Sequence, residues 1–383
     1  MKDIVDIRNE IDKIDDQLSS LFIQWLNLVI DVAEYKKNNS KGINDTSRED
    51  KILYRLAKDK PEEYKYYLKE LYQTIFATSK SYQSKLISSS SKSIELINKA
   101  IENEKPFPIT ASVACQGVQG SNSSVACKSA FPISDITYFK SFEGVFNAVE
   151  KGFCEYGVLP IENSTAGSVL EVYDLMNKYS FYIARSVRVK INHCLVGVKG
   201  ATKADVKKII SHQQALSQCS AYLKDLGIKG ESVENTALAA QIVSETNDKS
   251  LACLCRKECA EIYNLEVLEE NVQDNMANYT RFIVISKNLQ VHEGSNKISI
   301  ITSAPHETGS LSKILARFSA LGLSLTKLES RPIVGSDFEF LFYFDFEGSV
   351  KDKSCVNLIS ELENTSQHFV FLGCYKEIIW NIV

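Results

Sequence analysis

Three short polar stretches contain residue types that could bind a carboxylate substrate, namely hydroxyls, amides and backbone N–H groups at helix starts. They read PIENST at residues 160–165, SHQQAL at 211–216 and NYTRF at 278–282. The third opens a strongly β-prone run, so its side chains would lie on a rigid element. We expect the three stretches to line one cleft.

The overall composition indicates several folded domains. The chain has 383 residues, too many for one ordinary hydrophobic core, so two or three domains are expected. Its net charge of −4 gives no electrostatic reason to expect nucleic acid or an anionic membrane as a partner. No segment has the length and composition of a signal peptide or a membrane span.

The cysteines and glycines suggest neither a metal nor a nucleotide. No pair among the ten cysteines has C-x-x-C spacing, and the closest group is Cys253, Cys255 and Cys259. This pattern predicts reduced structural thiols in a cytoplasmic protein. The loop with Gly117 and Gly120 matches neither a P-loop nor a dinucleotide fingerprint. We therefore expect no cofactor and no metal.

Residues 1–90 predict an all-α domain. From Ile4 to Tyr35 the apolar residues step by alternating threes and fours, a heptad seam of more than four repeats. A capping-box sequence at 46–49 starts a second helix, and Pro61 opens a third. At about 1.5 Å per residue the first helix is roughly 50 Å long, too long for the other two to cover. An intertwined dimer would bury it.

The rest of the chain predicts two further units. After a linker at residues 91–107, residues 108–287 alternate strand and helix patterns, which is typical of α/β layers. A long β pattern at 183–198 could cross between two lobes around a cleft. Residues 296–376 follow the order strand, helix, strand, strand, helix, strand of a ferredoxin-like fold.

The motifs PIENST, SHxQAL and NYTRF, in this order, resemble those of prephenate dehydratases. The flanking segments extend the resemblance to the bifunctional chorismate mutase/prephenate dehydratases. This implies a helical mutase domain, a central domain like the two-lobed periplasmic binding proteins, and an ACT regulatory domain. It also implies the rearrangement of chorismate to prephenate and the decarboxylation and dehydration of prephenate to phenylpyruvate, in phenylalanine biosynthesis.

The resemblance marks Thr280 as the catalytic residue of the dehydratase, donating a hydrogen bond to the departing ring oxygen. Arg281 would share its pocket only if the strand is irregular, since a regular strand points neighbours to opposite faces. The other expected pocket residues are Asn163, Ser164, Thr165, Ser211, Gln214 and Thr236. Taken singly, such residues are more often turn or helix-cap residues.

The resemblance to the helical chorismate mutases runs through seven positions. The rearrangement of chorismate to prephenate needs no covalent catalysis. The pocket binds the two carboxylates of chorismate and stabilises the negative charge that develops on its ether oxygen. Lys36 and Gln83 would face that oxygen. The other five residues that match the family are Arg8, Asp45, Arg48, Glu49 and Ser79. Arg8 would meet Lys36 of a second chain. Any one of these charges alone is more often a solvated surface charge.

One mutase position departs from the family. Where the family has a second arginine on the long helix, this chain has Trp25, with no cation beside it. Losing a charged hydrogen bond to a carboxylate costs about 1.5–3 kcal/mol. Mutase activity could therefore be reduced by one or more decades.

The loop PHETGSL at 305–311 and the run ESRP at 329–332 resemble the ligand motifs of ACT domains. This implies that phenylalanine binds there between subunits of a homodimer or tetramer and inhibits the dehydratase. The residues concerned are Gly309, Ser310, Leu311, Glu329, Ser330, Arg331 and Pro332.

Two other hypotheses remain beside the bifunctional enzyme. In the first, the chain is a dehydratase whose helical domain only dimerises, because of Trp25. In the second, it is a non-catalytic amino-acid sensor, since a two-lobed cleft joined to an ACT module would suit ligand binding alone. Separate assays of chorismate and prephenate consumption distinguish the three.

Overall fold

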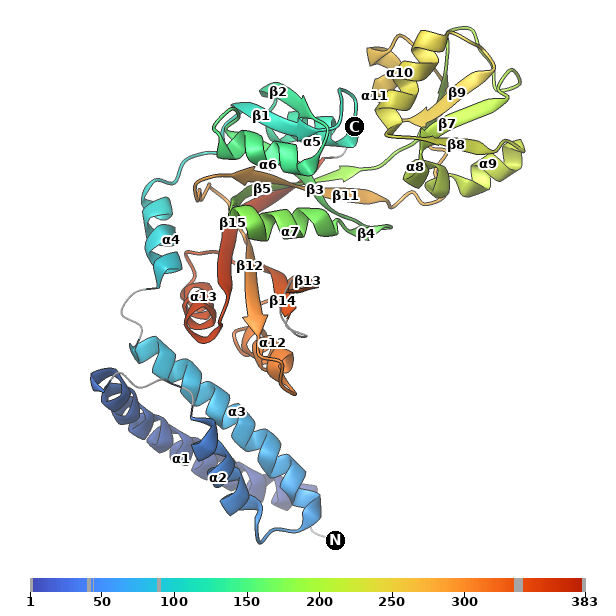
Figure 1. Cartoon of the computed structure of the whole chain (residues 1–383). Coiled ribbons are helices and arrows are strands. Elements are labelled where there is room, and N and C mark those ends of the chain that lie inside the picture. Colours follow the sequence, from blue (N-terminus) through green and yellow to red (C-terminus); the bar gives the residue numbers. More distant parts are fainter. Residues whose placement is uncertain (1–2, 40–42, 44, 88–90, 334–339, 381–383) are drawn as a thin grey trace.

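The computed structural model describes residues 3–39, 43, 45–87, 91–333 and 340–380. The N-terminal part is helical, as predicted, and lies at one end of the molecule (Figure 1). Its helices are α1 (Ile4–Asn38), α2 (Thr46–Ala57) and α3 (Glu62–Ile87). Asp3 and Asp45 cap α1 and α2 by accepting hydrogen bonds from backbone N–H groups of the first turn.

The described part of the chain leaves most of the apolar seam of α1 uncovered. Its residues Ile7, Ile11, Ile14, Leu18 and Leu21 are 38–60% exposed. Only Val29 and Ala33 of this helix are buried. A single chain therefore leaves a long apolar stripe in contact with solvent.

The central part divides into two lobes with separate sheets, as predicted. In the first lobe β1 pairs in parallel with β2 and β3, while β11 runs antiparallel between β3 and β5. Helices α5, α6 and α7 pack against this sheet. The elements are β1 (Thr110–Gln116), α5 (Asn122–Ala130), β2 (Ile133–Phe139), α6 (Phe142–Glu150), β3 (Tyr156–Asn163), β4 (Gly167–Ser168), α7 (Leu170–Tyr179), β5 (Tyr182–Lys190) and β11 (Tyr279–Ser286).

The second lobe has strand order β10-β6-β9-β7-β8. The β pattern predicted over residues 183–198 breaks at residues 191–193, so that β5 and β6 belong to different sheets and the segment crosses between the lobes. The elements are β6 (Cys194–Gly197), β7 (Lys208–His212), α8 (Gln213–Gln218), α9 (Ser220–Leu226), β8 (Gly230–Val233), α10 (Thr236–Thr246), β9 (Leu251–Cys255), α11 (Lys257–Ile262) and β10 (Glu266–Glu269).

The C-terminal part has the predicted order of strands and helices, with sheet order β13-β14-β12-β15. Helix α4 (Lys92–Glu102), in the predicted linker, buries Ile97 in the core of this part. The elements are β12 (Lys297–Ala304), α12 (Ser310–Ala320), β13 (Leu325–Pro332), β14 (Phe340–Glu347), α13 (Lys353–Thr365) and β15 (Phe369–Trp380).

Strand β15 joins the C-terminal sheet to the first lobe. Its first half pairs with β12, and from Lys376 onward it pairs in parallel with β5. At the junction Gly373 has φ 141°, and a Cβ there would lie 2.5 Å from the carbonyl oxygen of Ile183. The predicted end of the third unit at residue 376 thus falls inside one continuous strand. None of the described helices is apolar over enough length to cross a bilayer.

Candidate active sites

Thr280 lies at the start of β11, directly opposite Asn163 at the end of β3. Nδ2 of Asn163 donates to Oγ1 of Thr280 at 2.9 Å. Thr280 is partly exposed, whereas Asn163 is buried. The hydroxyl is therefore held in a polar cluster and is not sealed in an apolar core.

The orientation of the Asn163 amide is fixed by its own loop. Its Oδ1 accepts from the backbone N–H groups of Thr165 and Ala166, at 3.0 and 2.9 Å. A backbone N–H can only donate, so Nδ2 must be the atom that faces Thr280. Oγ1 of Thr280 then accepts from Asn163, and the proton of the Thr280 hydroxyl is left for another acceptor.

Ser164 joins the PIENST loop to the NYTRF stretch by two hydrogen bonds. Its backbone N–H donates to the carbonyl oxygen of Tyr279 at 2.8 Å, and its Oγ accepts from the N–H of Tyr279 at 2.9 Å. Asn278, which is 1% exposed, accepts at Oδ1 from Nδ2 of Asn163 at 2.9 Å. The structure thus brings together Asn163, Ser164 and Thr280, with Thr165 exposed in the same loop.

Among the described residues, no hydrogen bond joins the predicted residues of the second lobe to this cluster. Ser211 is fully buried, and its Oγ donates to the carbonyl oxygen of Leu254 at 2.5 Å. Gln214 is exposed in α8, and Thr236 is the first residue of α10. The Ser211 side chain is therefore committed to the interior of its lobe, while Gln214 and Thr236 remain accessible.

A glycine loop of the first lobe approaches the second lobe near Thr236. A Cβ on Gly120 would lie 3.1 Å from Sγ of Cys259 and 3.9 Å from Cβ of Ala237, the second residue of α10. Arg256 also bridges the lobes, with Nη1 donating to the carbonyl oxygen of Lys190 at 2.8 Å. The start of α10 thus lies beside the boundary between the lobes.

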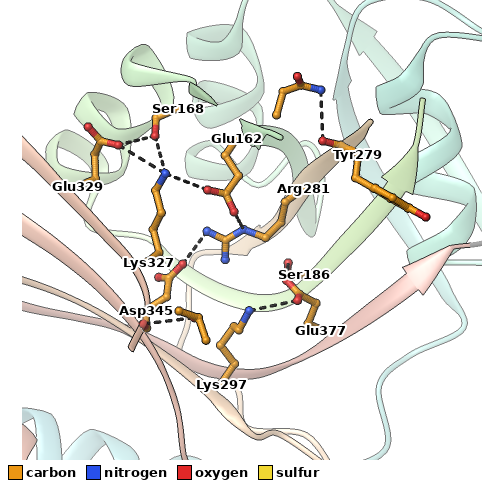
Figure 2. A network of polar contacts seen from close by, with 12 residues as sticks. Glu162, Ser168, Ser186, Tyr279, Arg281, Lys297, Lys327, Glu329, Asp345 and Glu377 are labelled. Atoms are coloured by element: carbon orange, nitrogen blue, oxygen red, sulfur yellow. Dashed lines mark hydrogen bonds and ion pairs between the residues drawn. The ribbon is translucent and has the colours of Figure 1, made fainter. Parts of the chain in front are cut away.

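Arg281 is not brought to Thr280 but belongs to a buried ion-pair network on the other side of β11 (Figure 2). Its guanidinium lies 2.7 Å from Oε1 of Glu162 and 2.6 Å from Oδ2 of Asp345 on β14. The side chain is 6% exposed. The alternation of a strand separates neighbouring side chains in this way, so the expected substrate contact of Arg281 has no support in the geometry.

The ESRP run also faces the first lobe. Arg331 makes a bidentate contact with Asp174 of α7, at 2.9 and 2.6 Å. Glu329 accepts a hydrogen bond from Ser168, and Lys327 contacts Glu162 at 2.9 Å (Figure 2). Ser330 and Pro332 are exposed on the same strand. Strand β13 therefore connects the C-terminal part to β3, the strand that carries Asn163.

The other predicted regulatory stretch lies at the start of α12. Gly309 has φ 81° and precedes the helix, Ser310 is buried, and Leu311 is partly buried. A cavity of about 390 Å³ adjoins them, lined in part by Ser310, Leu311, Phe340 and Phe342. This is within the size range of small-molecule sites, about 300–1,000 Å³.

In the helical part, four charged groups gather where α1, α2 and α3 meet. Nζ of Lys36 donates to the carbonyl oxygen of Ile43 at 2.7 Å, and Nζ of Lys80 lies 2.7 Å from Oε1 of Glu49. Burial lowers the pKa of Lys36, the Asp45 and Glu49 carboxylates oppose this, and the Lys80 ammonium lowers it further. Asp45 also accepts from the backbone N–H of Arg48 at 3.1 Å.

Ser79 and Gln83 are buried one turn apart on α3. Nε2 of Gln83 donates to Oγ of Ser79 at 2.9 Å. Oε1 of Gln83 is buried and has no hydrogen-bond partner among the described residues. A buried polar atom without a partner calls for an explanation, and a bound ligand or an ordered water would each supply one. Arg8 and Arg48 are exposed, and the ring of Trp25 stacks on Phe22 with centroids 5.9 Å apart.

Three residues of these sites were not singled out from the sequence. Asn278 stands within NYTRF and could have been found as part of the motif. Lys80 directly follows Ser79. Asp345 is the one acidic residue inside the otherwise apolar run FLFYFDF at 340–346, and a lone acid in such a strand signals a buried ion pair.

The chain matches two family models. Chorismate mutase type II matches residues 7–84, and prephenate dehydratase matches residues 113–290. These spans cover the four-charge cluster of the helical part and the Asn163–Thr280 pair.

Known proteins extend this likeness. A bifunctional chorismate mutase/prephenate dehydratase from Buchnera aphidicola is 30% identical over 96% of this chain and 95% of its own. Arogenate dehydratase/prephenate dehydratase 1 from Arabidopsis thaliana is 37% identical over 69% of this chain and 71% of its own. The prephenate dehydratase structure from Arthrobacter aurescens, solved with L-Phe, is 26% identical, with a TM-score of 0.64 over 69% of this chain and 89% of its own.

Proposed function

This chain belongs to the family of bifunctional chorismate mutase/prephenate dehydratases, and we propose that its two reactions occur at the sites around Gln83 and Thr280. It is an enzyme of phenylalanine biosynthesis that rearranges chorismate to prephenate and converts prephenate to phenylpyruvate. The observation that carries the assignment of the dehydratase site is the hydrogen bond from Asn163 to Thr280.

Prephenate loses carbon dioxide and its ring hydroxyl together, and formation of the aromatic ring drives the reaction. The enzyme must stabilise negative charge on the oxygen that departs. Because Asn163 donates to Thr280, the Thr280 hydroxyl keeps its proton for that oxygen. An alcohol is a weak acid, so Thr280 acts as a fixed hydrogen-bond donor while the bond breaks and not as a full proton donor.

The two substrate carboxylates require donors around Thr280. We assign Thr165 of the PIENST loop and, from the second lobe, Gln214 and Thr236 to this role. Thr236 begins an eleven-residue helix, whose first N–H groups and dipole favour an anion. The polar atoms of Ser164, Ser211 and Arg281 already bind protein groups, so Ser164 would hold the loop, Ser211 the interior of the second lobe and Arg281 the C-terminal sheet against the first lobe.

The dehydratase assignment is tested with Thr280→Ala and Thr280→Ser. Removing one positioned donor typically lowers kcat by 10²–10³-fold, so Thr280→Ala should lose about this much prephenate turnover, while Thr280→Ser keeps most of it. Thr110→Ala, at an exposed position of the same sheet, is the control. Arogenate is assayed in parallel, because the Arabidopsis relative is named for both substrates. Full prephenate turnover by Thr280→Ala would exclude the assignment.

In the helical part, chorismate rearranges without covalent chemistry when both of its carboxylates are held. Lys36 provides an ammonium, and Gln83 a buried amide, for the ether oxygen that gains negative charge. We expect Lys36→Met to lose at least tenfold in chorismate turnover, because a hydrogen bond to a charged group is worth about 1.5–3 kcal/mol. Lys37→Met, at the next, exposed position, should match the wild type.

We further propose that phenylalanine binds at the cavity beside Gly309, Ser310 and Leu311 and inhibits the dehydratase. Two phenylalanine rings, from Phe340 and Phe342, offer it an apolar wall, and the Arthrobacter relative was solved with L-Phe. Ser330 and Pro332, which are exposed, would complete the site from a second chain, whereas Glu329 and Arg331 already bind Ser168 and Asp174 of their own chain. Leu311→Ala should weaken both L-Phe binding by calorimetry and inhibition of prephenate turnover. Unchanged L-Phe affinity would argue against this location.

A further inference from the structure

The helical site faces a shortage of positive charge. Chorismate carries two carboxylates, and each needs a cation or several neutral donors. Of the arginines in this part, Arg8 and Arg48 are exposed in a single chain, and Trp25 places an uncharged ring on the long helix. Within one chain Lys36 alone would have to neutralise two carboxylates and also stabilise the ether oxygen, and Arg8 of a second chain would match only one of these carboxylates.

Lys80 is a second cation inside the same cluster. It stands between Ser79 and Gln83 on α3, and its Nζ lies 2.7 and 3.0 Å from the two carboxylate oxygens of Glu49. Only 24% of its side chain is exposed. It is also close enough to Lys36 to act electrostatically on that ammonium. Lys80 thus pairs with Glu49, while Lys36 is influenced by the carboxylates of both Asp45 and Glu49.

We propose that Lys80 binds a chorismate carboxylate and so supplies the cation that Trp25 does not. The proposal rests on the mutase activity assigned above. Lysine carries a compact charge on a flexible four-carbon stem, so Nζ can turn from Glu49 to a carboxylate of the bound substrate. Glu49 is then free to accept a hydrogen bond from the ring hydroxyl of chorismate.

If Lys80 had only a structural role, its substitution would affect chorismate turnover in a different way. If Lys80 only neutralised Glu49, any loss of activity on removing it would come from Glu49 and would not depend on a cation elsewhere in the pocket. If Lys80 binds the substrate, a cation placed at Trp25 on the facing helix should compensate for its loss. An arginine at position 80 should also retain function, because it can bind a carboxylate with two hydrogen bonds.

The test compares chorismate kinetics of full-length Lys80→Met, Lys80→Arg and the double variant Lys80→Met/Trp25→Arg. We expect Lys80→Met to raise KM for chorismate at least tenfold, Lys80→Arg to stay within a few-fold of wild type, and the double variant to regain most of the loss. Lys69→Met, at an exposed position of α3, is the matched control. Prephenate turnover should be unchanged in every variant, which shows that the chain is folded.

Two results overturn the proposal in distinguishable ways. If the wild type consumes chorismate and Lys80→Met does so with the same KM, or if Trp25→Arg brings no recovery, Lys80 does not bind the substrate. If the wild type consumes no chorismate while it still consumes prephenate, the mutase assignment itself fails, and the role of Lys80 fails with it.

Discussion

Asn163 shows how one side chain sets the chemistry of its neighbour. Two backbone N–H groups hold its Oδ1, which leaves Nδ2 as the donor to Thr280. An aspartate at this position would be isosteric but could only accept. The Thr280 hydroxyl would then donate to that carboxylate instead of to the departing oxygen.

We therefore predict that Asn163→Asp lowers kcat for prephenate by about 10²-fold or more, the usual effect of losing a positioned donor. Steady-state kinetics measure the loss. Chorismate turnover by the same variant serves as the internal control, because the helical site does not include Asn163. An Asn163→Asp enzyme with wild-type prephenate turnover would show that Thr280 needs no donor beside it.

Lys36 gives the helical site a pH dependence of defined sign. Burial lowers its pKa, Asp45 and Glu49 partly oppose this effect, and Lys80 adds to it. A lysine with a lowered pKa loses its proton at a lower pH than a free lysine, and in the role proposed for Lys36 only the charged form would stabilise the ether oxygen. Chorismate turnover should therefore fall as pH rises through that pKa, below the usual range of lysine.

Removing the Lys80 charge provides the control for this prediction. Without the second ammonium the pKa of Lys36 should rise, so the alkaline limb of the chorismate kcat profile of Lys80→Met should move to higher pH. The kcat profile is used because it reports the substrate complex. A limb that stays in place would mean that a different group controls it.

At the scale of elements, strand β11 has two functions on its two faces. Thr280 meets Asn163, while Arg281 crosses to Asp345 of β14 and to Glu162 of β3 (Figure 2). Oδ1 of Asp345 also accepts from Oγ of Ser299 at 2.5 Å. Strand β11 and the C-terminal sheet are therefore joined by a buried charge pair.

We predict that Asp345→Asn lowers the free energy of unfolding by about 1.5–3 kcal/mol, the usual contribution of a hydrogen bond to a charged group, because Glu162 still pairs with the buried guanidinium. Chemical denaturation measures the change. Glu231→Gln, which removes the partner of Lys208 in an exposed ion pair, should cost less than about 1 kcal/mol. Equal effects of the two substitutions would show that the Arg281 pair is not more important than a surface pair.

The sequence predicted the elements well where one physical signal dominated. The heptad seam, Pro61 and the capping-box residues place the three N-terminal helices. The alternating pattern over residues 183–198 predicted that this segment crosses between the lobes. It did not predict that the strand is interrupted at residues 191–193, because β propensity does not depend on which sheet a strand joins. The pairing of β15 with β5 could also not be predicted from the sequence, since it depends on contacts between residues far apart in the chain.

The sites were predictable to a similar degree. The pairing of Asn163 with Thr280 follows from two polar motifs at strand ends. Strand alternation indicated that Arg281 would point away from Thr280 in a regular strand, but Arg281 was still expected among the residues that bind substrate. Its partner Asp345 lies 64 residues further along, and no local pattern connects them. Ser211 lies in a polar motif, yet its hydroxyl binds a backbone carbonyl within its own lobe, which only the packing could show.

At the scale of the whole molecule, we propose that the exposed stripe of α1 packs against a second copy of the chain. Five seam residues from Ile7 to Leu21 are 38–60% exposed, and such a continuous apolar stripe normally marks an interface. Arg8 is about 28 residues from Lys36, or roughly 40 Å along a helix, so the two can share a pocket only across a pair of chains. The interface and the helical site therefore depend on each other.

We predict that Leu18→Glu disrupts this pair, because it places a charge in the middle of the seam. The mass in solution, measured by light scattering, should fall towards that of one chain, and chorismate turnover should fall at least tenfold as Arg8 of the second chain is lost. Prephenate turnover should be largely retained, since Asn163 and Thr280 come from one chain. Ser19→Glu adds the same charge beside the seam and should change neither property. Full chorismate turnover by a Leu18→Glu monomer would mean that each helical site is complete within a single chain.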